Sequence, residues 1–295
     1  MFGKVLTAMI TPFDEKLDVN YREAVKIARH LAENGSEGIV VAGTTGEAPN
    51  LSAEEKIKLF QEIKQAVGNS LKVIGGVGTY STTESVKLAR RCSDIGIDGI
   101  MAVVPYYNKP SQEGLYQHFK AIAEATDLPV MLYNIPGRTS VNMLPQTVRR
   151  LAEIPNIVCI KEAAGNMDQV SELKTSLPDT FTIYSGDDSL TLPMLSLGGA
   201  GVVSVASHLV GKQIRKMVDA FFNGEWQTAL KWHSLLYPIF KGLFITTNPV
   251  PVKFLLNESG FNVGTYRLPL VGPSQSEQAI LKELLVKIQK VPEEI

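Results

Sequence analysis

The sequence predicts a (β/α)8 TIM barrel, an α/β fold, followed by a helical extension. Within residues 1–224 one unit recurs eight times: a short apolar run rich in β-branched residues, a polar loop and an amphipathic helix. Alternating strands and helices indicate a parallel sheet. Eight units fit a closed barrel better than an open doubly wound sheet, which usually has five or six strands. The GxGxxG pattern typical of such an open sheet is absent from this sequence.

Each apolar run is short enough to be a single buried strand. The expected strands cover residues 5–10, 38–42, 72–77, 98–103, 129–134, 157–161, 181–185 and 201–205. The helices between them carry start and stop signals. Ser52 and Ser81 are each followed by glutamate three positions later, which is the pattern of a capping box. Gly35, Gly68 and Gly96 stand where left-handed helix ends are expected.

The first helix is expected to bury one apolar face. Its apolar residues at helical spacing are Ala24, Ile27, Ala28 and Leu31. Arg22, Lys26 and Glu33 fall on the opposite face and should contact solvent. After residue 223 the pattern changes to helices without strands, over 226–244, 250–259 and 276–290. We therefore expect a barrel domain over 1–224 and a helical domain over 225–295.

Composition excludes several classes of function. The chain of 295 residues has a formal net charge of -1, and its basic and acidic residues are interleaved, so a nucleic-acid partner is not expected. Residues 190–210 lack charged side chains, but Pro193 and three glycines break this stretch, so no membrane span is expected. The N-terminus resembles a first strand, and two cysteines make no disulfide framework. We expect a cytoplasmic protein.

Lys161 is the most informative residue because it closes the apolar run 157–161. Burial disfavours the charged form of an amine, and a neutral amine is a nucleophile that forms Schiff bases with carbonyl substrates. The alternative is a lysine at a strand end whose stem is buried and whose ammonium reaches water. Side chains at the carboxyl ends of barrel strands line the active site, which favours the catalytic interpretation.

Other polar side chains follow the expected strands at the same end of the barrel. Tyr133 shares strand parity with apolar neighbours, as Lys161 does, so both can point into the barrel. Its hydroxyl would reach the amine, or else bond to backbone in an ordinary barrel layer. Thr44 and Thr45 lie between glycines and suit a carboxylate, although such threonines also form simple turns. Arg138 follows a Pro-Gly turn and suits a second carboxylate, the alternative being a distant acidic partner.

Neither a metal nor a phosphate site is indicated. Asp187 and Asp188 are adjacent, but no ligand cluster with usable spacing accompanies them, because the four histidines are scattered along the chain. The loops after the seventh and eighth strands lack a glycine-rich phosphate cup. A small keto acid therefore fits better than a phosphorylated sugar.

Four motifs together resemble the dihydrodipicolinate synthase and N-acetylneuraminate lyase superfamily. They are GTTGE at 43–47, YNIPGRT at 133–139, IKEA at 160–163 and SGDD at 185–188. The lysine and the GTTGE loop are shared across the superfamily and imply pyruvate Schiff-base chemistry. Arg138 and the Tyr106-Tyr107 pair are similar to the synthase branch, whose members are lyases that condense pyruvate with L-aspartate-4-semialdehyde in diaminopimelate and lysine biosynthesis.

The resemblance implies a role for each site residue. Lys161 would form the iminium, and Tyr133, Thr44 and Tyr107 would relay protons, with Tyr107 supplied by a neighbouring subunit. Thr45 would bind the pyruvate carboxylate. Arg138 would bind the carboxylate of the semialdehyde, and backbone near Gly186 and Val203 would line the site. No cofactor is implied, and the family is usually a homotetramer built from tight dimers, a dimer being the alternative.

Two alternatives in function stay open on the sequence. One is another pyruvate-dependent aldolase acting on a hydroxy-oxo acid or a deoxy sugar acid, and the other is a non-catalytic barrel used for binding. The resemblance also carries a departure. Where lysine-inhibited members have polar effector contacts, this chain has Ala53, Lys56 and Tyr80. An ammonium at Lys56 would repel a cationic effector, so weak or absent inhibition by lysine is expected.

Overall fold

The computed structural model describes residues 2–295, and its strands close into one barrel in chain order, from β1 to β8. The predicted (β/α)8 fold is thereby confirmed. The strands are β1 (Val5–Ala8), β2 (Gly38–Val41), β3 (Lys72–Gly76), β4 (Gly99–Val103), β5 (Val130–Asn134), β6 (Ile157–Glu162), β7 (Thr182–Ser185) and β8 (Gly201–Ser204). The predicted ranges differ from these by one or two residues at their ends, and β6 continues one residue beyond Lys161.

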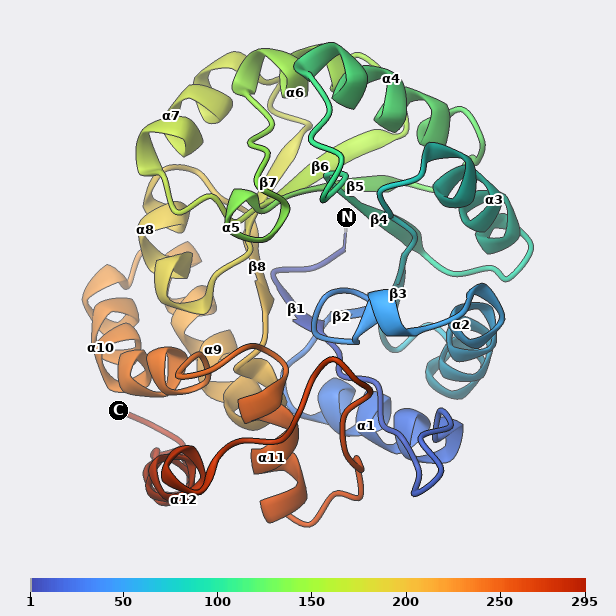
Figure 1. Ribbon diagram of the computed structural model, residues 1–295. Coiled ribbons are helices and arrows are strands. Elements are labelled where there is room, and N and C mark those ends of the chain that lie inside the picture. The colour runs from blue at the N-terminus through green and yellow to red at the C-terminus, as the bar shows by residue number, and fades with distance from the viewer. Residues whose placement is uncertain (1) are drawn as a thin grey trace. The chain divides into compact units, whose positions relative to one another are not determined.

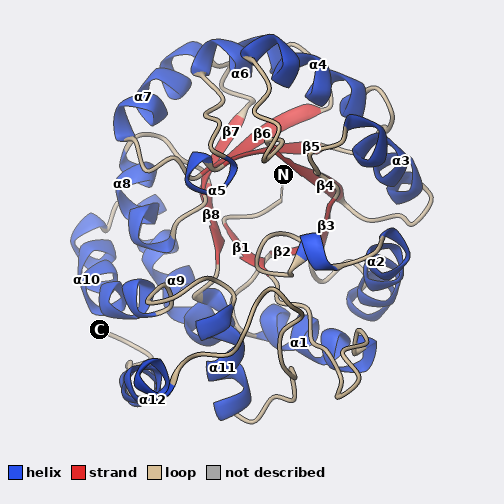
Figure 2. Ribbon diagram, in the orientation of Figure 1, coloured by secondary structure: helices blue, strands red, loops and turns tan. Residues whose placement is uncertain are grey.

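The chain divides into two compact units, and the first of them is continuous from Val73 to Val203. Within it, parallel pairing runs from β3 through β8. Figure 2 shows its helices in blue outside its red strands. Its helices are α3 (Thr82–Ser93), α4 (Gln112–Ala123), α5 (Pro136–Thr139), α6 (Pro145–Leu151), α7 (Met167–Ser176), η2 (Asp188–Leu190) and α8 (Thr191–Ser196).

The second unit combines the two ends of the chain, residues up to Lys72 with Ser204–Ile295. Its helices are α1 (Tyr21–Glu33), η1 (Ala48–Asn50), α2 (Ala53–Val67), α9 (Ser207–Phe222), α10 (Trp226–Gly242), α11 (Val250–Glu258) and α12 (Gln275–Gln289). Helix α9 packs on both β1 and α1. Helices α10 and α11 in turn pack on α9, and α12 covers α10 and α11. Figure 1 shows the blue and the orange segments side by side in this unit. The three predicted C-terminal helices are present, and the domain boundary at 224/225 stays a prediction.

Local sequence signals explain where several helices begin. Ser52 forms the complete capping box with Glu55, as predicted. At Ser81 the hydroxyl accepts the Glu84 N–H, while the Glu84 carboxylate pairs with Lys87 at 2.9 Å. The apolar face predicted for the first helix is buried in α1. All three predicted glycines have positive φ, but Gly68, with ψ of -122°, is not in the left-handed helical conformation.

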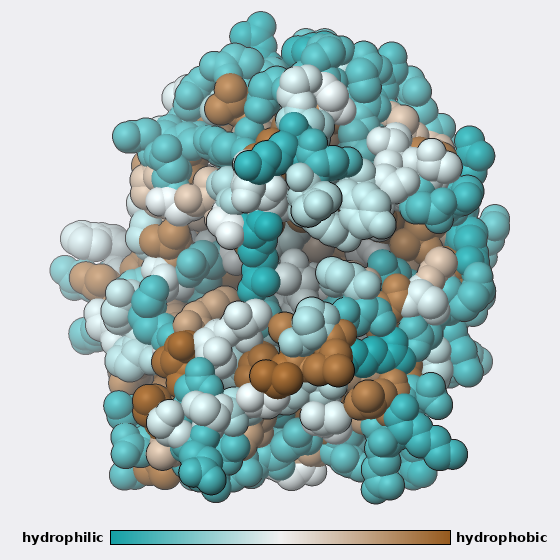
Figure 3. Space-filling model, viewed as in Figure 1, coloured by the Kyte–Doolittle hydropathy of each residue, from teal (hydrophilic) through white to brown (hydrophobic). Residues whose placement is uncertain are grey.

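Among residues 2–295, no helix combines the length and apolar character needed to cross a bilayer. The uncharged stretch 190–210 contains α8, β8 and the start of α9. It is broken at the glycines, as predicted, whereas Pro193 lies inside α8 and does not interrupt it. Figure 3 shows a mainly hydrophilic face with a hydrophobic patch in its lower half. The loop between α11 and α12 crosses this region, and there Leu268 is 77% and Val271 66% exposed.

Two buried histidines predict a loss of stability in acid. The His208 Nδ1 bonds to the Val205 carbonyl at 2.8 Å, and its Nε2 accepts the Ile10 N–H at 3.2 Å, which requires the neutral ring. Burial lowers the pKa of His208 to about 4, and burial likewise lowers the pKa of His118 to about 4. In the unfolded chain both should titrate near the ordinary value of about 6.5.

As pH falls from about 6.5 toward 4, the unfolded chain therefore binds two protons that the native chain does not, and the free energy of unfolding falls. At pH 5 the expected loss is about 2 kcal/mol for each histidine. Urea unfolding at pH 7 and pH 5 measures it, with His118→Gln as the comparison. A variant whose unfolding free energy depends on pH as steeply as that of the wild type would show that His118 does not contribute.

Candidate active site

The nucleophile predicted from sequence lies beside the predicted proton donor. Lys161 and Tyr133 are paired in register on β6 and β5. Their exposed fractions are 5% and 3%, and Lys161 Nζ lies 4.2 Å from the centroid of the Tyr133 ring. The amine therefore faces the π surface of the tyrosine at the carboxyl end of two adjacent strands. Such burial, with an aromatic neighbour, is the surrounding expected for a Schiff-base lysine.

Gly186 provides the space for the Lys161 side chain. A Cβ at residue 186 would stand 3.0 Å from Lys161 Cε and 2.7 Å from Ala163 Cβ. The Gly186 N–H also donates to the Glu162 carbonyl at 2.8 Å, so the backbone cannot easily withdraw. Glycine at this position is therefore favoured by the close approach of Ala163 Cβ together with the lysine stem.

Substitution Gly186→Ala should displace the Lys161 amine without removing it. Because misplacement of a reacting group by about 1 Å costs about 100-fold in rate, we expect kcat to fall by about 10- to 100-fold. Steady-state kinetics with Gly272→Ala as control measures the effect, since a Cβ at residue 272 meets only the Tyr266 ring, at 3.6 Å. Equal kcat in both variants would contradict the packing argument.

The other predicted residues of the continuous unit occupy loops and strand ends. Arg138 lies on the single-turn helix α5, directly after β5, and its side chain is exposed. Val203 is buried in β8, at 1% exposure. Tyr107 follows β4, has φ of 75° and is 93% exposed. No group of three or more His, Cys, Asp or Glu side chains in residues 2–295 is arranged to hold a metal ion.

Thr44 and Thr45 lie in the second unit, in the loop between β2 and η1. Thr45 is 2% exposed, and its hydroxyl accepts a hydrogen bond from Asn248 Nδ2 at 3.0 Å, while Thr44 is half-buried. Ala42 and Glu47 at the two ends of the loop have φ of 54° and 55°, in the left-handed region. Left-handed residues other than glycine persist only where the surrounding structure holds them.

A buried ion pair that sequence reasoning missed holds this loop. Lys253 Nζ lies 2.8 Å from Glu47 Oε1, and neither side chain is exposed. The ammonium also donates to the Thr265 carbonyl at 2.6 Å and lies 4.4 Å from the centroid of the Phe13 ring. Burial lowers the pKa of Lys253, and the Glu47 carboxylate opposes that effect. Glu47 belongs to the recognised GTTGE motif, but nothing in the sequence marks a lysine 206 residues away as its partner.

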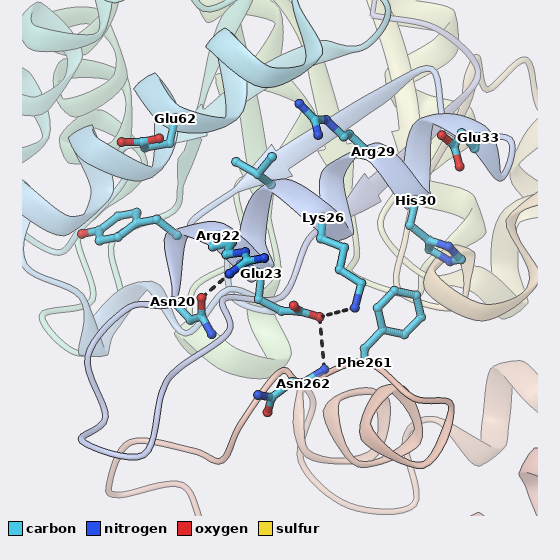
Figure 4. Close-up of a pocket in the computed structure, with 12 residues that line it drawn as sticks. Asn20, Arg22, Glu23, Lys26, Arg29, His30, Glu33, Glu62, Phe261 and Asn262 are labelled. Atoms are coloured by element: carbon cyan, nitrogen blue, oxygen red, sulfur yellow. Dashed lines mark hydrogen bonds and ion pairs between the residues drawn. The ribbon is translucent and has the colours of Figure 1, made fainter.

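A separate groove of about 1060 Å³ runs along the outer face of α1. Figure 4 shows Lys26 and the Asn262 backbone N–H both reaching the Glu23 carboxylate. The two contacts measure 3.2 and 3.1 Å. The groove is lined by three basic residues and three acidic residues, so its charge does not select a class of ligand. Its side chains are those expected of a solvated helix face.

The fold and the Lys161 site define the class of protein. A lysine buried beside a tyrosine at the carboxyl ends of (β/α)8 strands is the arrangement of an enzyme that forms Schiff bases with carbonyl substrates. Comparison with known proteins specifies the class further. The model of the "Dihydrodipicolinate synthetase family" matches residues 1–288, so the chain belongs to that family.

Individual relatives agree with the family match. The 4-hydroxy-tetrahydrodipicolinate synthase of Desulforudis audaxviator is 58% identical over 288 residues, which are 98% of each chain. That of Desulforamulus reducens is 59% identical over 285 residues, 96% of each chain. Among solved structures, the dihydrodipicolinate synthase of Cyanidioschyzon merolae with lysine bound has a TM-score of 0.96 and 45% identity, covering 98% of this chain and 99% of that one. The family resemblance predicted from the motifs is confirmed.

Proposed function

We propose that this chain is a lyase that condenses pyruvate with L-aspartate-4-semialdehyde to 4-hydroxy-tetrahydrodipicolinate, in diaminopimelate and lysine biosynthesis. The observation that carries the proposal is the buried Lys161 amine against the Tyr133 ring, within a chain that matches the family over residues 1–288. The names of the relatives that match nearly the whole chain support the same reaction.

The chemistry begins at Lys161. Its amine attacks C2 of pyruvate, and loss of water leaves a protonated imine, which accepts the electron pair released when a methyl proton departs. The resulting enamine carbon attacks the aldehyde carbon of the second substrate. The amine of that substrate then attacks C2, closes the ring and releases Lys161 as a free amine. Tyr133 would donate and accept the protons of these steps, for a gain of about 10²- to 10⁴-fold.

The remaining residues would bind and orient the substrates. Thr45, helped by Thr44, would hold the pyruvate carboxylate, and the Asn248 bond keeps the Thr45 hydroxyl in place. Arg138 would bind the carboxylate of the semialdehyde through its guanidinium. Gly186 and Val203 would line the site with backbone. The proposed mechanism needs no metal or organic cofactor, because the lysine itself supplies the electron-accepting group.

Tyr107 supports an oligomeric enzyme. A tyrosine that is 93% exposed and held at φ of 75° is suited to enter the site of a neighbouring subunit, where it would extend the relay from Tyr133 and Thr44. We propose a homotetramer made of two tight dimers, the dimer being the smaller assembly that would still complete the relay. We place the enzyme in the cytoplasm, in keeping with two free, buried cysteines.

The decisive test is turnover of the purified protein with pyruvate and L-aspartate-4-semialdehyde, coupled to a dihydrodipicolinate reductase and followed by NADPH consumption. We expect steady turnover. If the protein does not turn over these substrates but still forms a borohydride-trapped pyruvate adduct, the function is that of another pyruvate-dependent aldolase. The absence of both activities would indicate a barrel without catalysis.

Inhibition by L-lysine is expected to be weak or absent. Lys56 is 6% exposed, and its side chain offers a cationic effector no carboxylate. Ala53 has no polar side-chain group, and Tyr80 offers a hydroxyl but no carboxylate. Initial rates with L-lysine up to several millimolar test the prediction. An inhibition constant below 1 mM would contradict it.

A further inference from the structure

Glu162, the residue after Lys161, buries its carboxylate in a network of amides. Its exposed fraction is 2%. Oε1 accepts hydrogen bonds from the Ala164 N–H at 2.7 Å and from Asn134 Nδ2 at 3.2 Å. Oε2 accepts from Gln169 Nε2 at 3.1 Å and again from Asn134 Nδ2 at 3.1 Å. Every one of these partners is a donor, so the site is built for a group that only accepts hydrogen bonds, as an ionised carboxylate does.

A second arm of the network reaches the segment that follows Arg138. Asn134 Nδ2 donates to Asn142 Oδ1 at 2.8 Å, and Asn142 Nδ2 donates to Gln169 Oε1 at 2.7 Å. Gln169 Nε2 returns a longer bond of 3.3 Å to Asn142 Oδ1. The Met143 N–H donates to Asn134 Oδ1 at 3.0 Å. The network thus joins β5, β6 and α7 to the segment between α5 and α6.

Two backbone donors fix the direction of every bond in the network. The Met143 N–H requires Asn134 to present its oxygen there, which turns the Asn134 amide nitrogen toward Glu162 and Asn142. At the other end, the Ala164 N–H requires an acceptor at Oε1 of Glu162. Since neither backbone group can reverse, the side-chain amides between them have one consistent arrangement.

The network also lies directly behind the catalytic pair. Asn134 follows Tyr133, Glu162 follows Lys161, and the two network residues are paired in register as the catalytic residues are. Alternation along a strand places Asn134 and Glu162 on the opposite side of the sheet from Tyr133 and Lys161. Rotation of either strand end would therefore break bonds to Glu162.

We propose that Glu162 is a positioning residue, whose amide network holds Lys161 and Tyr133 in register and fixes the Arg138 segment relative to them. The inference rests on the proposed function for the roles of these three residues. It adds to that function a device that links the Schiff-base lysine to the segment that binds the second substrate.

The first test is Glu162→Gln, which is nearly identical in shape. Its amide nitrogen must face a donor, either the Ala164 N–H or Gln169 Nε2. If the side-chain amides of Gln169, Asn142 and Asn134 each turn over to restore the bond before them, two donors still meet at the end of the chain. The Asn134 amide nitrogen then faces the Met143 N–H, which cannot turn. We expect the rate of borohydride trapping with pyruvate, and kcat, to fall about 10- to 100-fold. The matched control is Glu172→Gln on α7, an exposed carboxylate bonded to Gln146, which should change neither.

The exchange variant Glu162→Gln/Gln169→Glu separates positioning from general damage. It returns one carboxylate to the network and lets the new amide at residue 162 donate to residue 169. The unfavourable contacts that remain are those at 3.1 Å to Asn134 Nδ2 and at 3.3 Å to Asn142 Oδ1. We expect its kcat to be at least about fivefold above that of Glu162→Gln, because residues in one network are not additive. A kcat equal to or below that of the single variant would overturn the proposal.

The Asn142→Ala variant tests the arm of the network that reaches the segment after Arg138. This variant should fold whether or not the Glu162 variants do, because Asn142 is half-exposed and water can replace its hydrogen bonds. We expect KM for the semialdehyde to rise about tenfold with the trapping rate for pyruvate unchanged. Equal changes for both substrates, or none, would overturn the linkage. Borohydride trapping needs pyruvate alone. The trapping rate of Glu162→Gln therefore tests the positioning of Lys161 even if the wild type does not turn over the semialdehyde. That failure would refute only the proposed function.

Discussion

Substitution Lys161→Ala should abolish both turnover and covalent capture of pyruvate. No other described residue contacts the Tyr133 ring with an amine, and removal of a covalent nucleophile costs on the order of 10⁴-fold or more in rate. Alanine adds no bulk and leaves no unpaired charge at this buried position, so the protein should remain folded despite the cavity. Coupled kinetics and mass spectrometry after borohydride treatment with pyruvate measure the two effects.

Two comparison variants give this prediction its specificity. Lys161→Arg keeps a cation against the Tyr133 ring but supplies no Schiff-base nucleophile, so it should be as inactive as the alanine variant. Tyr133→Phe keeps the amine and the ring, so it should still trap pyruvate while turnover falls about 10²- to 10⁴-fold. A pyruvate adduct mapped to another lysine in Lys161→Ala would move the nucleophile elsewhere.

Substitution Lys253→Met should produce the largest loss of stability. It leaves the Glu47 carboxylate without its cation in a place where neither side chain is exposed, and such a loss costs about 3–5 kcal/mol. Replacing both partners, Glu47→Gln with Lys253→Met, should recover a large part of that cost because no unpaired charge is left in the interior. Urea unfolding of the single and double variants gives the coupling energy.

An exposed ion pair supplies the matched control. Glu84 and Lys87 lie 2.9 Å apart, with their side chains 58% and 64% exposed, so Lys87→Met should cost less than about 1 kcal/mol. Lys253→Met should also raise KM for pyruvate when the variant is assayed at a temperature at which it is folded. Glu47 ends the loop that carries Thr44 and Thr45, so loss of its partner should loosen that loop. A loss as small as that of Lys87→Met would show that the buried pair does not hold the loop.

The fold and the juxtaposition of Lys161 and Tyr133 were predictable because their signals are local. Apolar runs, capping serines and glycine stops lie within a few residues of the structure they determine, and strand parity was enough to place Lys161 and Tyr133 on one side of the sheet. Gly186 was found through its motif, although the reason for glycine emerged only from the approach of the Lys161 stem.

The supporting interactions could not be predicted because each depends on at least one contact between segments that are distant in sequence. Glu162 and Asn142 belong to segments whose adjacency depends on the closed sheet, and neither residue type signals burial by itself. The Glu47 and Lys253 pair joins the start of the chain to its last quarter. A buried lysine in a C-terminal helix looks the same in sequence as a solvated one, which is why the pair was missed.

The division of the chain into two units has a consequence for synthesis on the ribosome. Residues Val73–Val203 are continuous, so all the partners of that unit have emerged once its last strand has been made. The other unit combines residues up to Lys72 with residues 204–295. Its strands β1 and β2 are made first, but α9, which packs on β1, follows about 200 residues later. Domains generally form as their residues emerge. The surface of nascent β1 that α9 covers therefore stays exposed until α9 has left the ribosome, and this is the interval in which a chaperone would be of most use.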